Sequence, residues 1–327
     1  MSKMQAVILA AGKSTRTYPL TLTRPKPLLK AANKTLLEHN LDNLDGIANE
    51  AVIVVGYKKD MIKKYIGKKY KGIKIRYIEQ KAQLGTGNAL LMAEKHIKGS
   101  FISLHGDDIY SNRDFKNVAR NRYSILTARL KNPKSFGIII QKNSLLTGLI
   151  EKPQRFVSDL VNTGLYKLDK SVFVLLKKLR KSKRNEYELT DAIKQLAKHD
   201  KVFCVKSSGW IPVGCPSDLL KADKALRKNK NSIWDNARIS GIARNSSIGN
   251  GCIIEGNVRN SIVMDGAIID KGSVVEDSII GENVHLSGRI LNSVVADNAE
   301  LKNVTVKNCK IWPNKAIQNK IVEKDAT

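Results

Sequence analysis

From Ile233 to about Ile317 apolar residues recur every six positions, and this repeat restricts the fold more than any other feature of the chain. The spacing runs through Val263, Ile269 and Val275, then Ile280 and Leu286, then Val295 and Leu301, with slips of register between the runs. Hexapeptide repeats are typical of a β-helix solenoid, whose coils pack their apolar corners on one another. A tripeptide motif also repeats, with a spacing of roughly one 17-residue coil. It reads Asn-Ser-Ile at 260–262, Asp-Ser-Ile at 277–279 and Asn-Ser-Val at 292–294. About 85 residues then predict roughly four to five coils.

The chain before this repeat alternates strand and helix patterns. Apolar runs typical of buried strands lie at 6–9, 51–56, 73–78 and 101–104, and helical spacing lies at 36–44, 60–70, 88–97 and 217–230. Repeated βα units with continuous apolar strands predict a mostly parallel sheet that is covered on both faces. Such sheets bind ligands at the carboxyl ends of their strands, which is where Gly12, Gly56 and Asp107 fall.

The net charge of +27 lies entirely in the α/β part of the chain. From Ile233 to the end there are 11 basic and 11 acidic residues, so all of the excess precedes it. This difference favours two domains, and a basic domain favours polyanionic partners. Many of the lysines are spread along predicted helices, as on solvated faces, and no nucleic-acid-binding motif accompanies them. Nucleic-acid binding therefore rests on charge alone and is not the favoured reading.

Several protein classes are excluded by composition. No apolar run approaches the ~20 residues of a membrane span, and the N-terminal apolar stretch runs into a Gly-rich turn without the pattern of a signal peptide. The four cysteines lack CxxC spacing, which argues against a disulfide framework or a zinc site and fits a reducing cytoplasm. We expect a cytoplasmic protein with no membrane partner.

The string LAAGKSTR at 9–16, followed by Pro25-Lys26-Pro27, is the first motif with chemical meaning. A strand that ends in a small-residue turn lets backbone N–H groups approach phosphate oxygens closely. Arg16 and Lys26 add two cations that could neutralise a triphosphate. A Gly-rich turn after a strand can also be plain turn chemistry, and the string is not a Walker A loop.

The complete string LAAGKSTR…TYPLT…RPKPLL resembles the signature of the sugar-1-phosphate nucleotidylyltransferases, also called NDP-sugar pyrophosphorylases. Further blocks similar to that family follow in order at 80–87 (QKAQLGTG), 106–107, 136–137, 151–153, 162–164, 186–193 and 216–220. The resemblance covers nearly the whole chain. It implies a Rossmann-like nucleotidyltransferase domain at 1–230 and a left-handed parallel β-helix at 231–327.

The resemblance also implies roles for matching positions. Nucleotide contacts fall to Leu9, Ala11, Gly12, Gln80, Gly85 and Thr86, sugar-phosphate contacts to Gly137, Glu151, Lys152 and Asn162, and catalysis to Arg16, Lys26 and Asp107. Asp107 would hold Mg²⁺. A sugar-1-phosphate oxygen attacks the α-phosphorus of a nucleoside triphosphate and pyrophosphate leaves, so no general base is needed and catalysis consists of positioning and charge neutralisation.

Two positions depart from the family pattern. Ser14 stands where the family usually has a second glycine. Pro212 stands in the family's W-x-D-V-G block, where an Asp usually supplies a second Mg²⁺ ligand. Asp107 alone could still hold Mg²⁺, because this ion keeps waters and takes phosphate oxygens from the substrate. The alternative is a catalytically silent regulatory subunit that binds an NDP-sugar.

The sequence thus favours a nucleotidyltransferase that uses UTP or dTTP with glucose-1-phosphate or N-acetylglucosamine-1-phosphate. Mannose-1-phosphate with GTP is the alternative substrate pair. The β-helix is expected to mediate homo-oligomerisation. Acetyl transfer on it is not expected, because His285 is its one histidine and the late Gly-rich block of acetyltransferase tails is absent.

Overall fold

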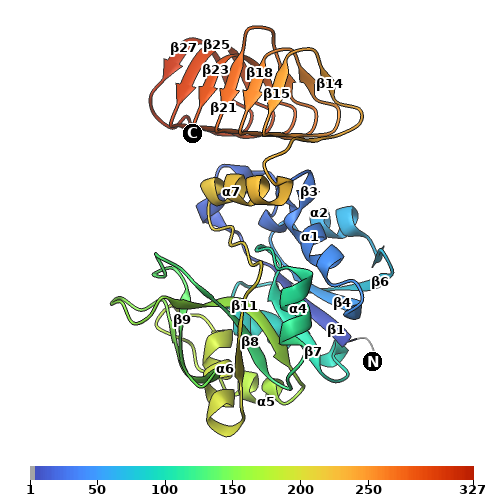
Figure 1. Ribbon diagram of the computed structural model, residues 1–327, viewed down its shortest axis with the longest axis vertical. Helices are drawn as coiled ribbons and strands as arrows, with labels where there is room; N and C mark the ends of the chain where they lie inside the picture. The colour runs from blue at the N-terminus through green and yellow to red at the C-terminus, as the bar shows by residue number, and fades with distance from the viewer. Residues whose placement is uncertain (1–3) are drawn as a thin grey trace. The chain divides into compact units, whose positions relative to one another are not determined.

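Residues 4–327 are described by the computed structural model and form two compact units (Figure 1). The first, here called the sheet unit, comprises the residues up to Gly12 and Leu37–Ile211. The second, the β-helix unit, comprises Lys13–Leu36 and Pro212–Thr327. Residues 13–36, which contain Arg16 and Lys26, therefore belong to the same unit as the C-terminal coils. The division at residue 230 stays a prediction.

The sheet unit is built on one sheet with the strand order β5-β6-β4-β1-β7-β11-β8-β12-β10-β9. Its strands are β1 (Met4–Ala10), β4 (Ala48–Val55), β5 (Lys69–Tyr70), β6 (Ile73–Glu79), β7 (Phe101–His105), β8 (Ser124–Arg129), β9 (Gly137–Lys142), β10 (Leu145–Glu151), β11 (Leu160–Leu168) and β12 (Phe203–Lys206). Strands β6, β4, β1 and β7 are parallel neighbours, as their apolar runs predicted. The other half is mixed, because β11 runs antiparallel to both β7 and β8. The α/β, Rossmann-like class is confirmed, with parallel pairing concentrated in the first half.

The helices of the sheet unit are α1 (Leu36–Asn43), α2 (Lys59–Ile66), α3 (Thr86–Met92), α4 (Asn112–Val118), α5 (Val172–Lys177) and α6 (Leu189–His199). Three of them, α1, α2 and α3, overlap the predicted segments, and α4, α5 and α6 were not predicted. Helix α2 is shorter than the predicted 60–70, because Gly67 takes a φ of 74° and caps the helix, after which 69–70 forms β5. Phe101 and Phe173 stack with ring centroids 5.7 Å apart in the core that α3, α5 and α6 cover. Over residues 4–327, no helix is both long and apolar enough to cross a bilayer.

The C-terminal coils form a parallel β-helix, as the repeat predicted; its left-handed sense remains an expectation from the family. One face is the six-stranded parallel sheet of β13 (Ser232–Ile233), β16 (Ser247–Ile248), β19 (Ile262–Val263), β22 (Ile279–Ile280), β24 (Val294–Val295) and β26 (Lys310–Ile311). The other strands, several of which are labelled in Figure 1, form a nine-stranded sheet. In it β14 (Arg238–Ile239), β17 (Ile253–Ile254) and β20 (Ile268–Ile269) stack toward the start of β23 (His285–Leu291), and β15 (Ile242–Arg244), β18 (Asn257–Arg259) and β21 (Val274–Glu276) stack toward its end. Strands β25 (Glu300–Lys307) and β27 (Ala316–Val322) follow β23.

The described stack has six rungs, where we expected four to five coils. Partners in the six-stranded face are 15 to 17 residues apart: Ser247 pairs with Ile262 and Ile262 pairs with Ile279. Coils shorter than 17 residues account for the difference, because the six strands lie between Ser232 and Ile311. This variation in coil length is also the cause of the slips of register seen in the sequence.

A ladder of buried serines explains the tripeptide motif with a central serine that repeats in the sequence. The backbone N–H of Ser261 donates to Ser246 Oγ at 3.1 Å, and that of Ser278 donates to Ser261 Oγ at 3.1 Å. The ladder continues through Ser293 to Cys309. Each serine hydroxyl in turn donates to a carbonyl two residues earlier, as Ser261 does to Arg259 at 2.6 Å. The repeated serine therefore satisfies backbone groups at the turn of each coil.

Asp223 ties three parts of the β-helix unit together. It lies on α7 (Pro216–Arg227) and pairs with Arg227 at 2.6 Å, and both side chains are at most 2% exposed. Its Oδ1 accepts from the N–H of Ala32 at 2.8 Å and from Ser247 Oγ at 2.5 Å. Ala32 follows the short strand β2 (Lys30–Ala31), which pairs with β3 (Lys34–Thr35). One carboxylate thus joins α7, this hairpin and the first coils.

Replacing Asp223 by alanine should destabilise this unit strongly. The change leaves the buried guanidinium of Arg227 without its carboxylate, which costs about 3–5 kcal/mol of unfolding free energy. Denaturant titration followed by tryptophan fluorescence measures the loss. Asp235→Ala, at an exposed position of the same unit, is the control and should change stability by less than about 0.5 kcal/mol. Equal effects of the two substitutions would contradict the assignment.

Candidate functional site

The predicted nucleotide segments meet at one edge of the parallel half of the sheet. Leu9 is in register with Val54 and His105, and Val55, at the end of β4, pairs with Glu79. The residues that follow these strand ends, Gly12, Gly56, Gln80 and Asp107, therefore emerge at the same edge. The carboxyl ends of these strands thus bring the four residues together, and their role in binding a nucleotide stays a prediction.

Close packing at this edge requires small residues. A Cβ on Gly56 would lie 2.7 Å from the carbonyl oxygen of Ala11, and the N–H of Tyr57 donates to the same oxygen at 3.1 Å. The side chain of Gln83 also donates to Ala11 O, at 3.3 Å. The turn after β1 is thus fixed by the ends of its neighbours, with Ala11 buried and Gly12 exposed.

The loop at 80–87, which carries the predicted nucleotide contacts Gln80, Gly85 and Thr86, is held by its own Gln80. The Gln80 amide donates to Gly85 O at 3.1 Å and to Asn88 Oδ1 at 2.9 Å. Gly85 has a φ of 99°, and a Cβ there would lie 2.7 Å from the carbonyl oxygen of Tyr187. Thr86 accepts from the N–H of Leu189 at 3.2 Å. Gln80, Gly85 and Thr86 are therefore brought together, with Gln80 shaping the loop.

Gly137, Glu151 and Asn162 form a second cluster on β9, β10 and β11. A Cβ on Gly137 would lie 3.0 Å from Glu151 Oε2 and 3.6 Å from Asn162 Cβ. Asn162 donates to the hydroxyl of Tyr166 at 2.6 Å and accepts from the N–H of Gly164 at 2.9 Å. The structure thus brings together three residues that sequence reasoning assigned to the sugar.

Charged side chains converge on Glu151. Lys152 Nζ lies 3.8 Å and Arg184 Nη1 3.6 Å from Glu151 Oε1, and Thr190 donates to Oε2 at 3.3 Å. Arg184 also pairs with Glu188 at 3.2 Å. Burial raises the pKa of the Glu188 carboxyl, Arg184 opposes this, and the charge of Glu151 adds to it. Two carboxylates and a shared arginine therefore lie beside the predicted sugar residues.

Sequence reasoning missed the role of the segment 184–190 in joining the two clusters. The N–H of Tyr187 donates to Leu84 O at 2.8 Å, and the N–H of Gly87 donates to Tyr187 O at 2.7 Å. The same segment supplies Arg184 and Thr190 to Glu151. The signal was present as the family-like block at 186–193, to which no contact was assigned; its Leu189 is a core residue, 1% exposed.

The paired aspartates after β7 have different surroundings. Asp108 is buried, and its Oδ2 accepts from the indole N–H of Trp210 at 3.2 Å. Its backbone oxygen accepts from Asn40 at 2.7 Å. Asp107 is half-buried at the exposed end of the strand. Asp108 thus fixes the turn, and Asp107 is the better candidate for a ligand.

Arg16 and Lys26 belong to the β-helix unit. Arg16 is exposed, and its Nη1 lies 4.0 Å from where a Cβ on Gly214 would be, two residues after Pro212. Lys26 is 4% exposed and begins the 3₁₀ turn Lys26–Leu28. Ser14 has a φ of 52°, the left-handed conformation that favours glycine, which accounts for the glycine that the family usually has there.

Residues that could hold a metal ion are few. Among residues 4–327 no group of three or more His, Cys, Asp or Glu side chains is arranged to hold one. Mg²⁺ does not need such a group, because one or two carboxylates, waters and substrate phosphates complete its octahedral shell. The half-buried carboxylate of Asp107, beside the nucleotide edge, fits that limited requirement.

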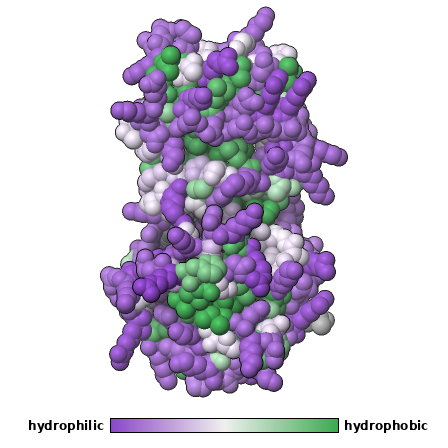
Figure 2. Space-filling model, turned by 60° about the vertical axis from the view of Figure 1, so that its left-hand side comes forward, coloured by the Kyte–Doolittle hydropathy of each residue, from purple (hydrophilic) through white to green (hydrophobic). Residues whose placement is uncertain are grey.

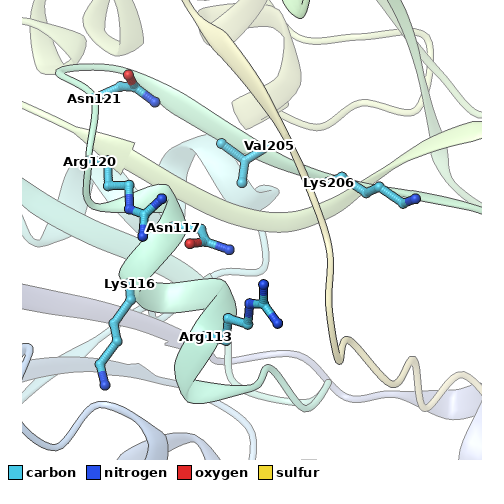
Figure 3. Close-up of a pocket in the computed structure, with 7 residues that line it drawn as sticks. All are labelled: Arg113, Lys116, Asn117, Arg120, Asn121, Val205 and Lys206. Carbon is cyan, nitrogen blue, oxygen red and sulfur yellow. The ribbon is translucent and has the colours of Figure 1, made fainter.

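A separate surface pocket of about 460 Å³ lies on α4 and β12 and holds none of the predicted site residues (Figure 3). Its cations are Arg113, Lys116, Arg120 and Lys206, with the amides of Asn117 and Asn121. All four cations are exposed. The face drawn in Figure 2 is mostly hydrophilic, in keeping with a chain of 57 basic residues.

Replacing Gly85 by alanine should disturb the loop at 80–87. A Cβ would force both an unfavourable φ and a contact with Tyr187 O, at a cost of about 1–3 kcal/mol. Gly99→Ala is a matched control, because a Cβ there meets nothing within 4 Å. The melting temperature and the affinity for the nucleotide should both fall in Gly85→Ala and stay unchanged in Gly99→Ala. Unchanged stability and affinity in that variant would contradict the loop geometry.

Comparison with known protein families and structures agrees with this arrangement. The family model "Nucleotidyl transferase" matches residues 5–229, and the model "GMPPB C-terminal domain" matches 225–327. The chain is 38% identical over 251 residues to the bifunctional protein GlmU of Methanococcus vannielii, covering 73% of this chain and 60% of that protein. The chain thus spans less than two thirds of that relative.

A second relative is matched over nearly its full length. The UTP–glucose-1-phosphate uridylyltransferase AglF of Haloferax volcanii is 34% identical over 236 residues, which are 69% of this chain and 97% of AglF.

Solved structures show the same fold in the first part of the chain. A UDP-glucose pyrophosphorylase complexed with UDP-glucose has a TM-score of 0.62 at 22% identity, covering 70% of this chain and all of that one. A putative glucose-1-phosphate thymidylyltransferase from Bacillus anthracis has a TM-score of 0.62 at 26% identity, covering 68% and 95%. With a family model across most of its length and a relative spanned almost completely, the chain belongs to the nucleotidyl transferase family.

Proposed function

We propose that the protein transfers a nucleotidyl group from a nucleoside triphosphate to a sugar-1-phosphate, forming an NDP-sugar and pyrophosphate. One observation carries the proposal: a single sheet presents the nucleotide segments at its parallel strand ends and the Gly137–Glu151–Asn162 cluster on its antiparallel strands. The segment 184–190 bonds to both. Two substrates that react with each other need two adjoining subsites of this kind.

The reaction needs no general base. An oxygen of the sugar phosphate attacks the α-phosphorus in line, the bond to the β-phosphate oxygen breaks, and pyrophosphate leaves. The attacking oxygen is already anionic, so no proton has to be removed. We assign the stabilisation of the charge on the α-phosphate and on the leaving pyrophosphate to Arg16 and Lys26. The backbone around Leu9, Ala11 and Gly12 would bind the nucleotide.

We assign Mg²⁺ to Asp107. Enzymes of this family generally depend on a divalent metal ion. Bound there, Mg²⁺ would supply neutralisation of phosphate charge. The turn that carries Asp107 is fixed by Asp108, Trp210 and Asn40, so the carboxylate is held without a contribution from Pro212.

The favoured substrates are UTP or dTTP with glucose-1-phosphate or N-acetylglucosamine-1-phosphate. The names of AglF and of the thymidylyltransferase support this choice, as does the Gln80 loop. Lys152 would bind the sugar phosphate, and Gly137, Glu151 and Asn162 the sugar hydroxyls. We further propose a cytoplasmic homo-oligomer that assembles through the β-helix; the free state of all four cysteines is consistent with a reducing compartment.

Pyrophosphate release across four nucleoside triphosphates and several sugar-1-phosphates tests the function directly. Arg16→Ala and Lys26→Ala should each lower kcat by about 10²-fold or more, as loss of a charge-stabilising group does. Lys95→Ala, at an exposed position of the sheet unit, should have no effect. Unchanged kcat in both variants would remove these residues from the mechanism. Binding of an NDP-sugar without turnover of any pair would favour a regulatory subunit.

Replacement of Pro212 by aspartate tests the departure from the family pattern. A second carboxylate adds a hard oxygen ligand, so Pro212→Asp should lower the Mg²⁺ concentration needed for half-maximal rate. Pro212→Ala controls for loss of the ring, and Asp107→Ala should abolish the metal response. Initial rates against Mg²⁺ concentration give the result. If the wild-type rate already saturates at low Mg²⁺ and Pro212→Asp has the same half-maximal Mg²⁺ concentration, another group completes the Mg²⁺ site.

A further inference from the structure

Three carboxylates, here called the acidic column, stack on consecutive coils of the β-helix unit. Asp265, Glu282 and Asp297 each lie two residues beyond a strand of the six-stranded face, after β19, β22 and β24. Those strands are parallel neighbours in register, so the three positions are equivalent. Neighbouring coils are separated by about 4.8 Å. Carboxylates this close repel one another unless cations lie between them.

The two aspartates of the column use their oxygens in the same way. Asp265 Oδ1 accepts from the N–H of Asn250 at 3.0 Å, and Asp297 Oδ1 accepts from the N–H of Glu282 at 2.8 Å. A Cβ on Gly281 would lie 2.6 Å from Asp297 Oδ1, so glycine is needed there. One oxygen of each aspartate is thereby fixed to the adjoining coil, and the other faces the segment 13–36.

Residues of the segment 13–36 supply the cations. Arg24 Nη2 lies 2.5 Å from Asp297 Oδ2, and Arg24 Nη1 pairs with Glu282. Lys30 Nζ lies 2.5 Å from Asp265 Oδ2. Thr23 also donates to Asp297 Oδ2 at 2.5 Å. Two cations that lie six residues apart in the chain thus pair with all three carboxylates of the column.

Arg24 is deeply buried for a charged residue. Its side chain is 7% exposed, as is that of Asp297. Burial alone would lower the pKa of Arg24, but its hydrogen bond to Glu282 and the charge of Asp297 raise it, so it stays charged. Its Nε finds no hydrogen-bond partner among residues 4–327. The two carboxylates are therefore what holds this guanidinium in place.

The two cations lie on either side of Lys26. Lys26 begins the 3₁₀ turn Lys26–Leu28, two residues after Arg24 and four before Lys30. The N–H of Leu29 donates to Lys26 O at 2.9 Å, which closes the turn. Lys26 itself is 4% exposed. Both ends of the turn that carries Lys26 are consequently attached to the β-helix.

We propose that the acidic column positions Lys26 for nucleotidyl transfer, with Arg24 and Asp297 as positioning residues. The inference rests on the proposed function, since it concerns the role assigned to Lys26 there. It gives the β-helix a part in the reaction that is separate from assembly. A displacement of about 1 Å in a catalytic group can reduce a rate by about 10²-fold. Loss of the ion pair between Arg24 and Asp297 should therefore lower kcat.

Asp297→Asn tests the proposal in the full-length chain. The substitution keeps the shape of the side chain but removes the negative charge with which Arg24 pairs. It should lower kcat for pyrophosphate release by about tenfold or more. The KM for the sugar-1-phosphate should stay within about twofold, because the sugar cluster is on the other unit. Asp270→Asn is the matched control: it removes the same charge from an exposed site on the same β-helix, where Asp270 pairs with His285 at 2.9 Å.

A second measurement does not depend on turnover. The rate at which an amine-reactive reagent labels Lys26, followed by peptide mass spectrometry, should rise several-fold in Asp297→Asn and not in Asp270→Asn. Arg24→Lys, which keeps a cation, should give intermediate kcat and labelling. If Asp297→Asn does not fold, Arg24→Lys is decisive by the same two measurements.

The outcomes separate this inference from the proposed function. Unchanged kcat and unchanged labelling of Lys26, with only a lower melting temperature, would overturn positioning and leave a purely structural ion pair. A wild-type protein that turns over no substrate pair would overturn the proposed function, while the labelling still reports on the position of Lys26. In the Lys26→Ala background, Asp297→Asn should cause no further loss of kcat; a full additional loss would show that the column acts elsewhere.

Discussion

The register of the parallel strands is the constraint on which the sheet unit depends. Because β6, β4, β1 and β7 run in one direction and end at matching positions, the segments after them must share one edge. The edge is crowded, and this is why small residues such as Ala11 and Gly56 stand there. Backbone groups are then left close to any ligand bound at the edge. The antiparallel strands beyond β7 add a second cluster to the same sheet.

Stacking in register has a corresponding effect in the β-helix unit. A side chain repeated at one position of each coil becomes a column along the solenoid. Where the position is serine, the column satisfies backbone hydrogen bonds inside the stack. Where the position is acidic, the column carries negative charge with which Arg24 and Lys30 pair. The same geometry therefore yields an internal support in one place and an attachment surface in another.

Much of this architecture could be predicted from the sequence, for local reasons. Continuous apolar runs marked the parallel strands, small residues marked their ends, and the six-residue period marked the β-helix. What escaped prediction depends on contacts that no local pattern records. The capping of α2 at Gly67, the bonds of Tyr187 to the loop at 80–87, and the pairing of Arg24 with Asp297 all involve distant partners or special backbone angles. The acidic column was hidden because its members are 17 and then 15 residues apart.

The interleaving of the two units along the chain also bears on the order of folding. Arg24 and Asp297 are separated by 273 residues, so a ribosome releases Arg24 long before its partner exists. Until then Arg24 lacks the Asp297 carboxylate with which it pairs in the folded protein. Contacts of such long sequence separation form late and slow the final step of folding. The pairing of Arg24 with Asp297 of the β-helix would thus be among the last contacts to form. The nascent N-terminal part would be exposed to misassembly until synthesis is complete.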